Sequence, residues 1–232
     1  MSYTIESIAE YIGARRVGEC EATIDWLLTD SRSLSFPEET LFFALTTKRN
    51  SGARYIPDLY DRGVRNFVVT EEDFEKFKNG ELGKLSTLNF LIVANPLKAL
   101  QKLAEIHREE FKIPIIGITG SNGKTIVKEW LHQLLSPDRR IVRSPRSYNS
   151  QIGVPLSVWQ LNEEAELGIF EAGISEMGEM NALKRMIKPT IGILTNIDGA
   201  HQENFFSLQE KCMEKLTLFK DCDVVIYNGD NE

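Results

Sequence analysis

Short apolar runs alternate with amphipathic stretches along the second half of the chain. The apolar runs lie at residues 113–119, 167–171, 190–197 and 224–227, with a shorter one near 141–142. Segments with a helical period lie between them, up to residue 135, from about 152, and at 178–187 and 206–219. Apolar runs bounded by turn residues predict buried strands, and helical periodicity predicts covering helices. The alternation predicts an α/β fold with a mostly parallel sheet whose ligands bind at the carboxyl ends of the strands.

The first part of the chain shows a looser pattern of the same kind. It predicts helices near residues 4–13 and 54–63, an apolar segment at 40–45, and strands at 65–69 and 90–93. Residues 71–87 are rich in charge, and we expect a surface excursion there. Pro96 breaks the chain before a predicted helix at 97–111, which we interpret as a linker. The predicted domains are a small N-terminal α/β domain at residues 1–95 and a larger parallel α/β domain at 96–232.

Composition narrows the class of protein. A chain of 232 residues with 42% hydrophobic content is long enough to bury a core in one or two domains. A net charge of −7 without a long basic stripe argues against a nucleic-acid surface. The sequence contains three cysteines, Cys20, Cys212 and Cys222, without metal or redox spacing, so we expect reduced thiols. Because no apolar run of about 18 residues or basic leader is present, we expect a cytoplasmic protein without membrane insertion.

A glycine-rich turn follows the apolar run at 113–119. Residues 120–125 read Gly-Ser-Asn-Gly-Lys-Thr and begin a predicted helix. The two glycines let the backbone approach phosphate oxygens, and Lys124 adds a positive charge. Thr125 places a hydroxyl where a phosphate-bound Mg²⁺ would sit. The pattern, which begins at Gly117, is a variant of the usual P-loop; an ordinary turn is the alternative, but strand, turn and helix together favour a nucleotide site.

A carboxylate falls at the same predicted sheet edge. Glu171 ends the strand at 167–171, so we expect its side chain to point into the crevice that the glycine-rich turn lines. A hard oxygen ligand there suits Mg²⁺. The alternative is a helix cap or a surface carboxylate. His107 and His132 lie within predicted helices and are expected to be solvated or hydrogen-bonded surface histidines.

Three further segments resemble one family. Residues 148–155 read Tyr-Asn-Ser-Gln-Ile-Gly-Val-Pro, residues 170–173 read Phe-Glu-Ala-Gly, and residues 195–201 read Thr-Asn-Ile-Asp-Gly-Ala-His. With the glycine-rich turn, their order and spacing resemble the Mur ligases, the ATP-dependent amide ligases of peptidoglycan precursor synthesis. Residues 120–129 and 188–197 most resemble the member that joins D-alanyl-D-alanine to UDP-N-acetylmuramoyl-tripeptide. The resemblance spans nearly the whole chain and is thinner before residue 95.

The resemblance implies a magnesium and phosphate site. It implies that His201 is a second Mg²⁺ ligand beside Glu171, and that Asn149 contacts the terminal phosphate; for Asn149 a helix cap is the alternative. Mur ligases commonly carry a carbamylated lysine after the metal histidine. Lys211 and Lys215 are four apart on one predicted helical face. Alignment with the family through Phe205, Leu208 and Phe219 favours Lys215, and a solvated helix lysine is the alternative.

The N-terminal domain resembles the UDP-sugar-binding region of these ligases. Arg32 can grip a pyrophosphate and Ser31 can hydrogen-bond the uracil or the ribose. A further contact is expected at Gly52, although the surrounding residues depart from the family pattern. An ordinary turn with a salt bridge is the alternative for the Asp-Ser-Arg segment at 30–32.

The resemblance implies ATP and Mg²⁺ as cofactors and an acyl-phosphate route to the amide, with UDP-N-acetylmuramoyl-peptide and D-alanyl-D-alanine as substrates. It also implies a third, amine-binding domain, so we expect these 232 residues to be an inactive fragment whose sheet edge self-associates. The alternatives are the Mur ligase that adds the third peptide residue, or a P-loop switch or binding module, although a guanine-reading Asn-Lys-x-Asp is absent. The expected site residues are Gly120, Ser121, Asn122, Gly123, Lys124, Thr125 and Asn149 for ATP, Thr125, Glu171, His201 and Lys215 for the metal, Lys124, Asn149 and Lys215 for catalysis, and Ser31, Arg32 and Gly52 for the UDP-sugar.

Overall fold

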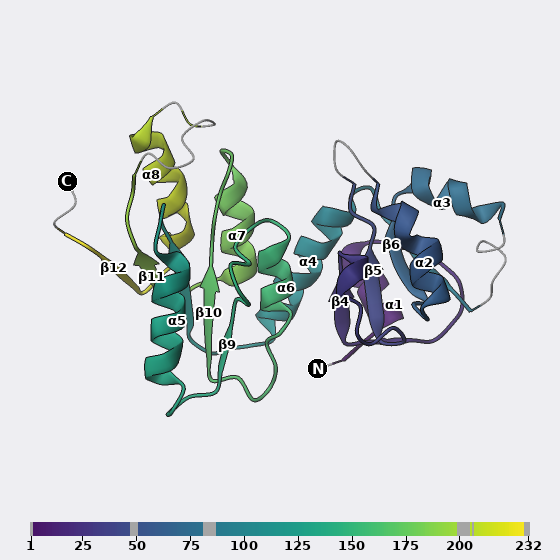
Figure 1. The fold of residues 1–232 in the computed structure, drawn as a ribbon, viewed down its shortest axis with the longest axis horizontal. Coiled ribbons are helices and arrows are strands. Elements are labelled where there is room, and N and C mark those ends of the chain that lie inside the picture. The colour runs from purple at the N-terminus through teal and green to yellow at the C-terminus, as the bar shows by residue number, and fades with distance from the viewer. Residues whose placement is uncertain (1, 47–50, 81–86, 199–204, 206, 230–232) are drawn as a thin grey trace. The chain divides into compact units, whose positions relative to one another are not determined.

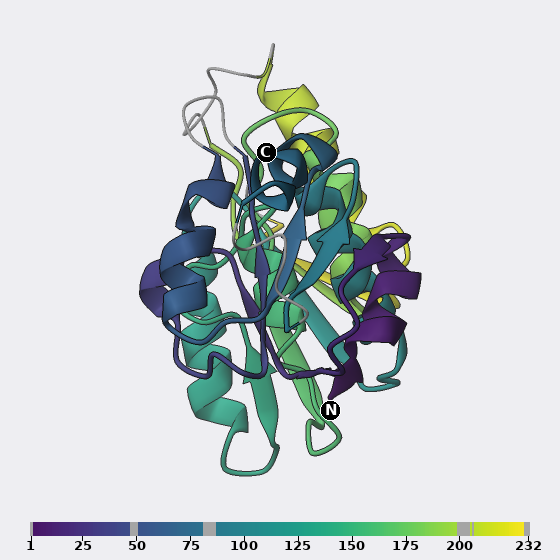
Figure 2. The ribbon, with the colours of Figure 1, turned by 90° about the vertical axis from the view of Figure 1, so that its right-hand side faces the viewer.

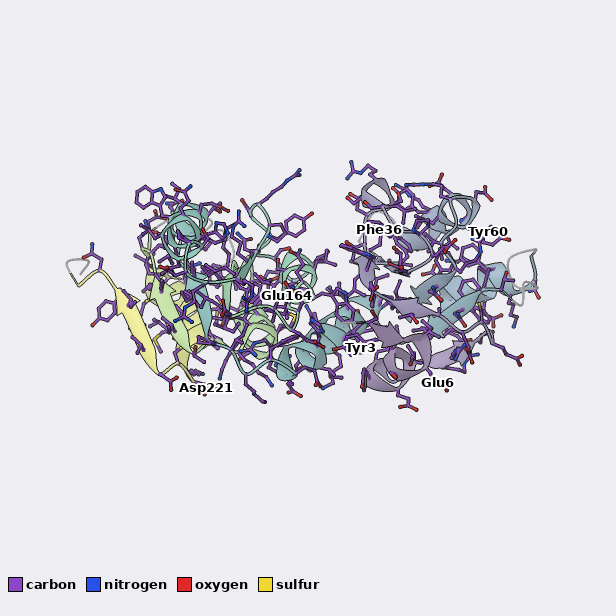
Figure 3. All side chains as sticks on the ribbon, turned by 90° about the horizontal axis from the view of Figure 1, so that it is seen from below. Tyr3, Glu6, Phe36, Tyr60, Glu164 and Asp221 are labelled. Atoms are coloured by element: carbon purple, nitrogen blue, oxygen red, sulfur yellow. The ribbon has the colours of Figure 1, made fainter. Side chains whose placement is uncertain are left out.

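The computed structural model describes residues 2–46, 51–80, 87–198, 205 and 207–229. The chain divides into two compact units, Met1–Leu103 and Ala104–Glu232, each of which is described by itself (Figure 1). The division falls inside helix α4 (Pro96–Glu109), the segment interpreted from the sequence as a linker. Side chains fill the interior of each unit, whereas charged groups such as Glu6 and Asp221 project from the surface (Figure 3).

In its described residues, the first unit is built on a five-stranded sheet in the order β2-β7-β6-β5-β4. Strands β4 to β7 run parallel, and β2 pairs antiparallel with β7. A separate two-stranded sheet joins β1 to β3. The strands are β1 (Tyr3–Thr4), β2 (Arg15–Val17), β3 (Thr23–Ile24), β4 (Trp26–Leu28), β5 (Thr40–Phe43), β6 (Asn66–Val69) and β7 (Asn89–Ile92). The sequence predicted β6 and β7 as strands and marked the segment of β5 only as apolar; it missed the other strands, which are too short to show a period.

Helices cover both faces of this sheet. They are α1 (Ile5–Ile12), α2 (Ile56–Asp61) and α3 (Glu71–Lys78), with 3-10 turns at Ser31–Ser33 and Gly52–Tyr55. Helices α1 and α2 lie on different sides of the sheet (Figure 2). The segment expected as a surface excursion at 71–87 begins with α3, most of whose residues are exposed; the sequence did not predict this helix. Thr70 caps α3 by accepting a hydrogen bond from the Asp73 amide at 3.1 Å, and Phe74 packs against Phe90, so one cap and one apolar anchor outweigh the charged composition.

The second unit has a five-stranded, fully parallel sheet in the order β12-β11-β8-β10-β9 within the described residues. The mostly parallel α/β fold predicted from the sequence is therefore confirmed. Its strands are β8 (Ile115–Thr119), β9 (Ile141–Arg143), β10 (Leu167–Glu171), β11 (Ile191–Leu194) and β12 (Val224–Tyr227). Its further helices are α5 (Lys124–Leu135), α6 (Gly153–Val158), α7 (Glu179–Ile187) and α8 (Leu208–Leu216), the last followed by a 3-10 turn at Thr217–Phe219.

Two layers of helices sandwich this sheet. Helix α5 packs Val127 and Leu131 against Ile118 and Ile169 on one face. Helices α6 and α7 cover the opposite face; in Figure 1, α5 lies on one side of β10 and both α6 and α7 lie on the other. Because β8, β10 and β11 are parallel neighbours, their carboxyl ends meet at one edge of the sheet, and this edge holds most of the residues singled out in the sequence.

Candidate functional site

The glycine-rich turn leaves β8 at Thr119 and enters α5 at Lys124. Gly120 has φ 147° and Gly123 has φ 81°, backbone conformations that residues with a Cβ rarely adopt. A Cβ on Gly120 would also lie 1.9 Å from the Thr195 hydroxyl oxygen. Gly123 is the N-cap of α5 and has no side chain to cap it, so the first-turn N–H groups of the helix are left for an anion.

The end of β11 clamps the turn in place. The Ser121 amide donates to the Asn196 carbonyl at 2.9 Å, and the Asn122 amide donates to the Asn196 side-chain oxygen at 2.8 Å. The Asp198 amide donates to the Ser121 hydroxyl at 3.0 Å, and the Thr195 hydroxyl donates to the Asn122 carbonyl at 2.5 Å. The amides of Ser121 and Asn122, two residues expected to bind ATP, are thus bonded to the neighbouring segment. This clamp also explains why β11 ends at Leu194, earlier than the sequence predicted.

Three lysine ammonium groups surround the turn. Lys124 Nζ donates to the Gly120 carbonyl at 2.9 Å, and Lys215 Nζ donates to the same oxygen at 3.0 Å. Lys211 Nζ donates to the Asp198 carbonyl at 2.9 Å. All three line a cavity of about 180 Å³ that Asn149, Ser150 and residues 173–175 complete. Three like charges around one small cavity favour an anion inside it.

Burial changes the proton affinity of these lysines. The pKa of Lys124 is lowered because burial disfavours the charged form, while the nearby Glu171 carboxylate opposes that change. Burial, together with the charges of Lys124 and Lys211, lowers the pKa of Lys215 to about 8. A lysine with such a pKa has a substantial neutral fraction near neutral pH, and a neutral amine can act as a nucleophile.

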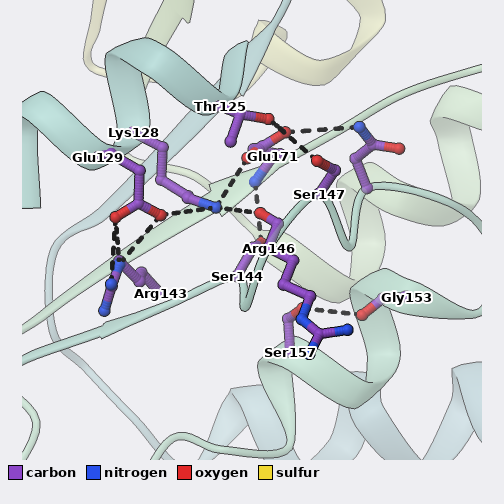
Figure 4. Close-up of polar contacts among 11 residues, drawn as sticks. Thr125, Lys128, Glu129, Arg143, Ser144, Arg146, Ser147, Gly153, Ser157 and Glu171 are labelled. Atoms are coloured by element: carbon purple, nitrogen blue, oxygen red, sulfur yellow. Dashed lines mark hydrogen bonds and ion pairs between the residues drawn. The ribbon is translucent and has the colours of Figure 1, made fainter.

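Glu171 lies at the end of β10 and is fully buried. Its Oε2 accepts hydrogen bonds from the Thr125 hydroxyl at 3.1 Å and from the Asn149 side-chain amide at 3.4 Å (Figure 4). Its main-chain N–H donates to the Ser144 hydroxyl at 3.2 Å. Neither a surface position nor a helix cap describes this carboxylate, so the alternative reading of Glu171 does not hold.

Asn149 lies beside Glu171 and does not cap α6. The side-chain oxygen of Ser150 accepts from the Gly153 amide at 3.1 Å and occupies the start of that helix instead. The Asn149 carbonyl accepts from the Gly173 amide at 2.8 Å, and a Cβ on Gly173 would lie 2.9 Å from the Asn149 side-chain oxygen. These contacts hold Asn149 at the edge of the cavity.

The oxygen atoms at this edge suit a hard divalent cation. Glu171 Oε2 and the Thr125 hydroxyl are 3.1 Å apart, so one Mg²⁺ can bind both. Among the described residues, no group of three or more His, Cys, Asp or Glu side chains gathers around a common point. The expected second ligand, His201, lies outside the described residues.

Sequence reasoning missed Lys128, which is fully buried on helix α5. Its Nζ lies 2.9 Å from Glu171 Oε1 and 3.2 Å from Glu129 Oε1, and it donates to the Arg146 carbonyl. One signal was available: Lys128 follows Lys124 by four residues and therefore lies one turn further along the same helical face.

The residues expected to hold the UDP-sugar are less clearly organised. Ser31 is buried, whereas the Arg32 side chain is 87% exposed and pairs with Asp30 at 2.6 Å, which lowers the pKa of Asp30. This is the turn with a salt bridge that was the alternative reading. Gly52 donates its N–H to the Leu45 carbonyl, and a Cβ there would lie 2.7 Å from that oxygen.

His107 differs from the expected ordinary histidine. It is buried, and its Nε2 lies 3.0 Å from the Leu161 carbonyl oxygen. Burial lowers its pKa from 6.5 to about 4. The ring packs against Phe111 and Trp159 in the second unit.

Comparisons with known proteins point to one family. A family profile described as the Mur ligase middle domain matches residues 118–232. The UDP-N-acetylmuramoyl-tripeptide–D-alanyl-D-alanine ligase of Borreliella burgdorferi is 34% identical over 218 residues, covering 91% of this chain and 46% of the relative. The enzyme of the same name from Bacillus subtilis is 30% identical over 232 residues, covering 98% and 49%. The chain therefore spans about half the length of the curated relatives it matches.

Solved structures share the fold. MurF from Acinetobacter baumannii superposes with a TM-score of 0.84 at 22% identity, covering 100% of this chain and 50% of that one. The MurF ligase of Thermotoga maritima, solved in complex with ADP, gives a TM-score of 0.73 at 24% identity, covering 88% and 45%. In the described residues, no helix is long and apolar enough to span a membrane.

Proposed function

This chain belongs to the Mur ligase family, and we propose that it carries the ATP site and the UDP-sugar site of a ligase that joins D-alanyl-D-alanine to UDP-N-acetylmuramoyl-tripeptide in the cytoplasm. The observation that supports the ATP site most directly is the meeting of the Lys124 and Lys211 ammonium groups, an uncapped helix start and the Glu171–Thr125 oxygen pair at one sheet edge. This combination suits a triphosphate with a bound cation.

The reaction proposed for this site has two steps. The terminal phosphoryl group of ATP passes to a carboxylate oxygen of the UDP-sugar peptide, which leaves ADP and an acyl phosphate. The amine nitrogen of D-alanyl-D-alanine then attacks the acyl carbon, the carbon–oxygen bond to phosphate breaks, and the amine loses a proton. Lys124 and Lys211 neutralise charge on the transferred group, and the first turn of α5 orients it.

The proposed cation-binding residues are Glu171, Thr125, His201 and Lys215. When bound, Mg²⁺ withdraws charge from the phosphate oxygens. Lys215 would take part as a carbamate, formed when its neutral amine adds to carbon dioxide and loses a proton. Its burial and its pKa of about 8 support this reaction, and the contact of Lys211 with the Asp198 carbonyl supports a different role for that lysine.

The remaining proposals assign a ligand to each predicted domain and concern the activity and self-association of residues 1–232. Residues 1–95 would hold the UDP end of the sugar nucleotide through Ser31, Arg32 and Gly52, and residues 96–232 would hold ATP. Residues 1–232 alone correspond to about half of each relative, so we propose that they release no amide product. Strand β12 lies at one edge of the described sheet with all four residues exposed, and this edge would support self-association of residues 1–232.

A fusion protein tests the proposed ligase function. Residues 1–232 are joined to the part of the Bacillus subtilis ligase that lies beyond its match with this chain, and amide formation is measured with ATP, Mg²⁺ and D-alanyl-D-alanine. Since this chain supplies the acceptor site, UDP-N-acetylmuramoyl-tripeptide should be the preferred acceptor over the dipeptide form. The same fusion with Lys124→Ala is the control. Preference for the dipeptide acceptor would favour the ligase that adds the third residue.

A further inference from the structure

Lys128 joins three segments of the second unit at one buried point. Its ammonium contacts Glu171 at the end of β10, Glu129 on its own helix α5, and the Arg146 carbonyl in the segment after β9 (Figure 4). The side chains of Lys128 and Glu171 are both fully buried. A charge in such a place is stabilised only when an opposite charge and hydrogen bonds surround it.

The two carboxylate oxygens of Glu171 have different partners. Oε1 lies 2.9 Å from Lys128 Nζ and has no hydrogen-bond partner among the described residues, so this ion pair holds it. Oε2 points to the other side, where the Thr125 hydroxyl and the Asn149 amide lie. Lys128 therefore fixes the rotation of the carboxylate that presents Oε2 to the cavity edge.

The same ammonium also holds the segment opposite Glu171. Arg146, whose carbonyl accepts from Lys128, has a positive φ of 50°, which is uncommon for a residue other than glycine. The next residues carry Ser147, whose hydroxyl lies 3.4 Å from that of Thr125, and Asn149, which contacts Glu171. One buried cation thus orders both sides of the Thr125 hydroxyl.

An outer ion pair provides an internal comparison. Glu129 binds Lys128 on one side and the Arg143 guanidinium on the other, at 3.1 Å. The Glu129 and Arg143 side chains are each 35% exposed. Removing Arg143 disturbs this outer pair but leaves the Lys128–Glu171 contact in place.

We propose that Lys128 is a positioning residue of the phosphate site: it holds Glu171 so that Oε2 and the Thr125 hydroxyl form a ready pair of oxygen ligands for a divalent cation. The proposal rests on the proposed function, in which this edge binds a cation with ATP. A purely structural ion pair would stabilise the fold without changing cation affinity. A positioning role predicts that Lys128→Met weakens metal binding in folded protein, whereas a purely structural role predicts unchanged metal affinity.

The test is a titration of the 232-residue protein with Mn²⁺ in the presence of ATP. Electron paramagnetic resonance detects the Mn²⁺ and gives its dissociation constant. Lys128→Met should raise the Mn²⁺ dissociation constant about tenfold or more, as loss of groups that orient metal ligands generally does. Arg143→Met should leave it unchanged, even if its unfolding midpoint falls. Equal Mn²⁺ affinity for wild type and Lys128→Met would overturn the proposal.

A double-variant cycle shows whether Lys128 acts through Glu171. In a Glu171→Gln background, the further change Lys128→Met should alter Mn²⁺ affinity little, because no carboxylate is left to orient. An equal further loss would overturn the proposal. This double variant removes both buried charges together, so its Mn²⁺ affinity can be measured even if Lys128→Met alone does not fold. In that case Lys128→Gln, which keeps a hydrogen-bond donor, replaces Lys128→Met and should bind Mn²⁺ with an affinity between those of the wild type and the double variant. Absence of Mn²⁺–ATP binding by the wild-type chain would instead overturn the proposed ATP site and this inference with it.

Discussion

Lys215 donates a hydrogen bond of 3.0 Å to the Gly120 carbonyl, which joins α8 to the glycine-rich turn across 95 residues of sequence. Lys124 donates to the same oxygen at 2.9 Å. Two ammonium groups that share one neutral acceptor repel each other, and an anion between them would remove that repulsion. The repulsion is relieved by a bound phosphate beside Lys124 or by conversion of Lys215 to a group without positive charge, and these two outcomes lead to the first two predictions.

Removing Lys124 should weaken ATP binding. Lys124→Ala deletes a charge-assisted hydrogen bond worth roughly 1.5–3 kcal/mol, so the ATP dissociation constant, measured by calorimetry, should rise about tenfold or more. Lys220→Ala, at an exposed position in the same unit, is the matched control and should bind ATP as the wild type does. Unchanged ATP affinity in Lys124→Ala would remove the turn from the proposed nucleotide site.

Carbamylation of Lys215 can be observed directly. With ¹³C-labelled bicarbonate and Mg²⁺–ATP present, we expect a carbamate resonance in the carbon spectrum of the wild-type protein. The resonance should disappear in Lys215→Ala and persist in Lys211→Ala. The reverse pattern would assign the modification to Lys211.

The close approach at Gly120 makes a stability prediction. Gly120→Ala places a methyl group against Thr195 and forces an alanine to adopt a backbone φ of 147°. The free energy of unfolding should therefore fall by about 1–3 kcal/mol. Denaturant titration measures this loss. Gly229→Ala, where an added Cβ meets nothing within 4 Å, should change stability by less than about 0.5 kcal/mol.

His107 makes the stability of the second unit depend on pH. Its pKa in the folded protein, about 4, lies below the ordinary value of 6.5, so the unfolded chain binds a proton first as the pH falls. Its contribution is fully present above pH 6.5 and is lost between pH 6.5 and about 4, by at most about 3 kcal/mol.

Unfolding titrations across that pH range test this prediction. His107→Gln cannot titrate and should flatten the pH dependence, although the variant is less stable at neutral pH. His132→Gln changes a less buried histidine and should leave most of the slope in place. An unchanged slope in His107→Gln would assign the pH dependence to other groups.

Local patterns allowed much of the second unit to be predicted. The glycine-rich turn, the strand before it and the helix after it are specified by neighbouring residues, because turn conformation and periodicity act over a few positions. Glu171 was predicted at the correct sheet edge for a similar reason: a residue that ends a parallel strand must lie at the carboxyl edge. The short strands of the first unit and α3 were missed because a few residues carry too little periodic signal.

The sequence by itself therefore determined the parallel α/β pattern, the phosphate-binding turn and the set of lysines and carboxylates near it. Only the tertiary structure decided how these groups are paired. It brought Lys215 to Gly120, Asn196 to the amides of the turn, and Lys128 to Glu171, contacts between segments far apart in the chain. A buried charge takes its partner from whatever the fold places within about 4 Å, and that distance depends on packing rather than on spacing along the sequence.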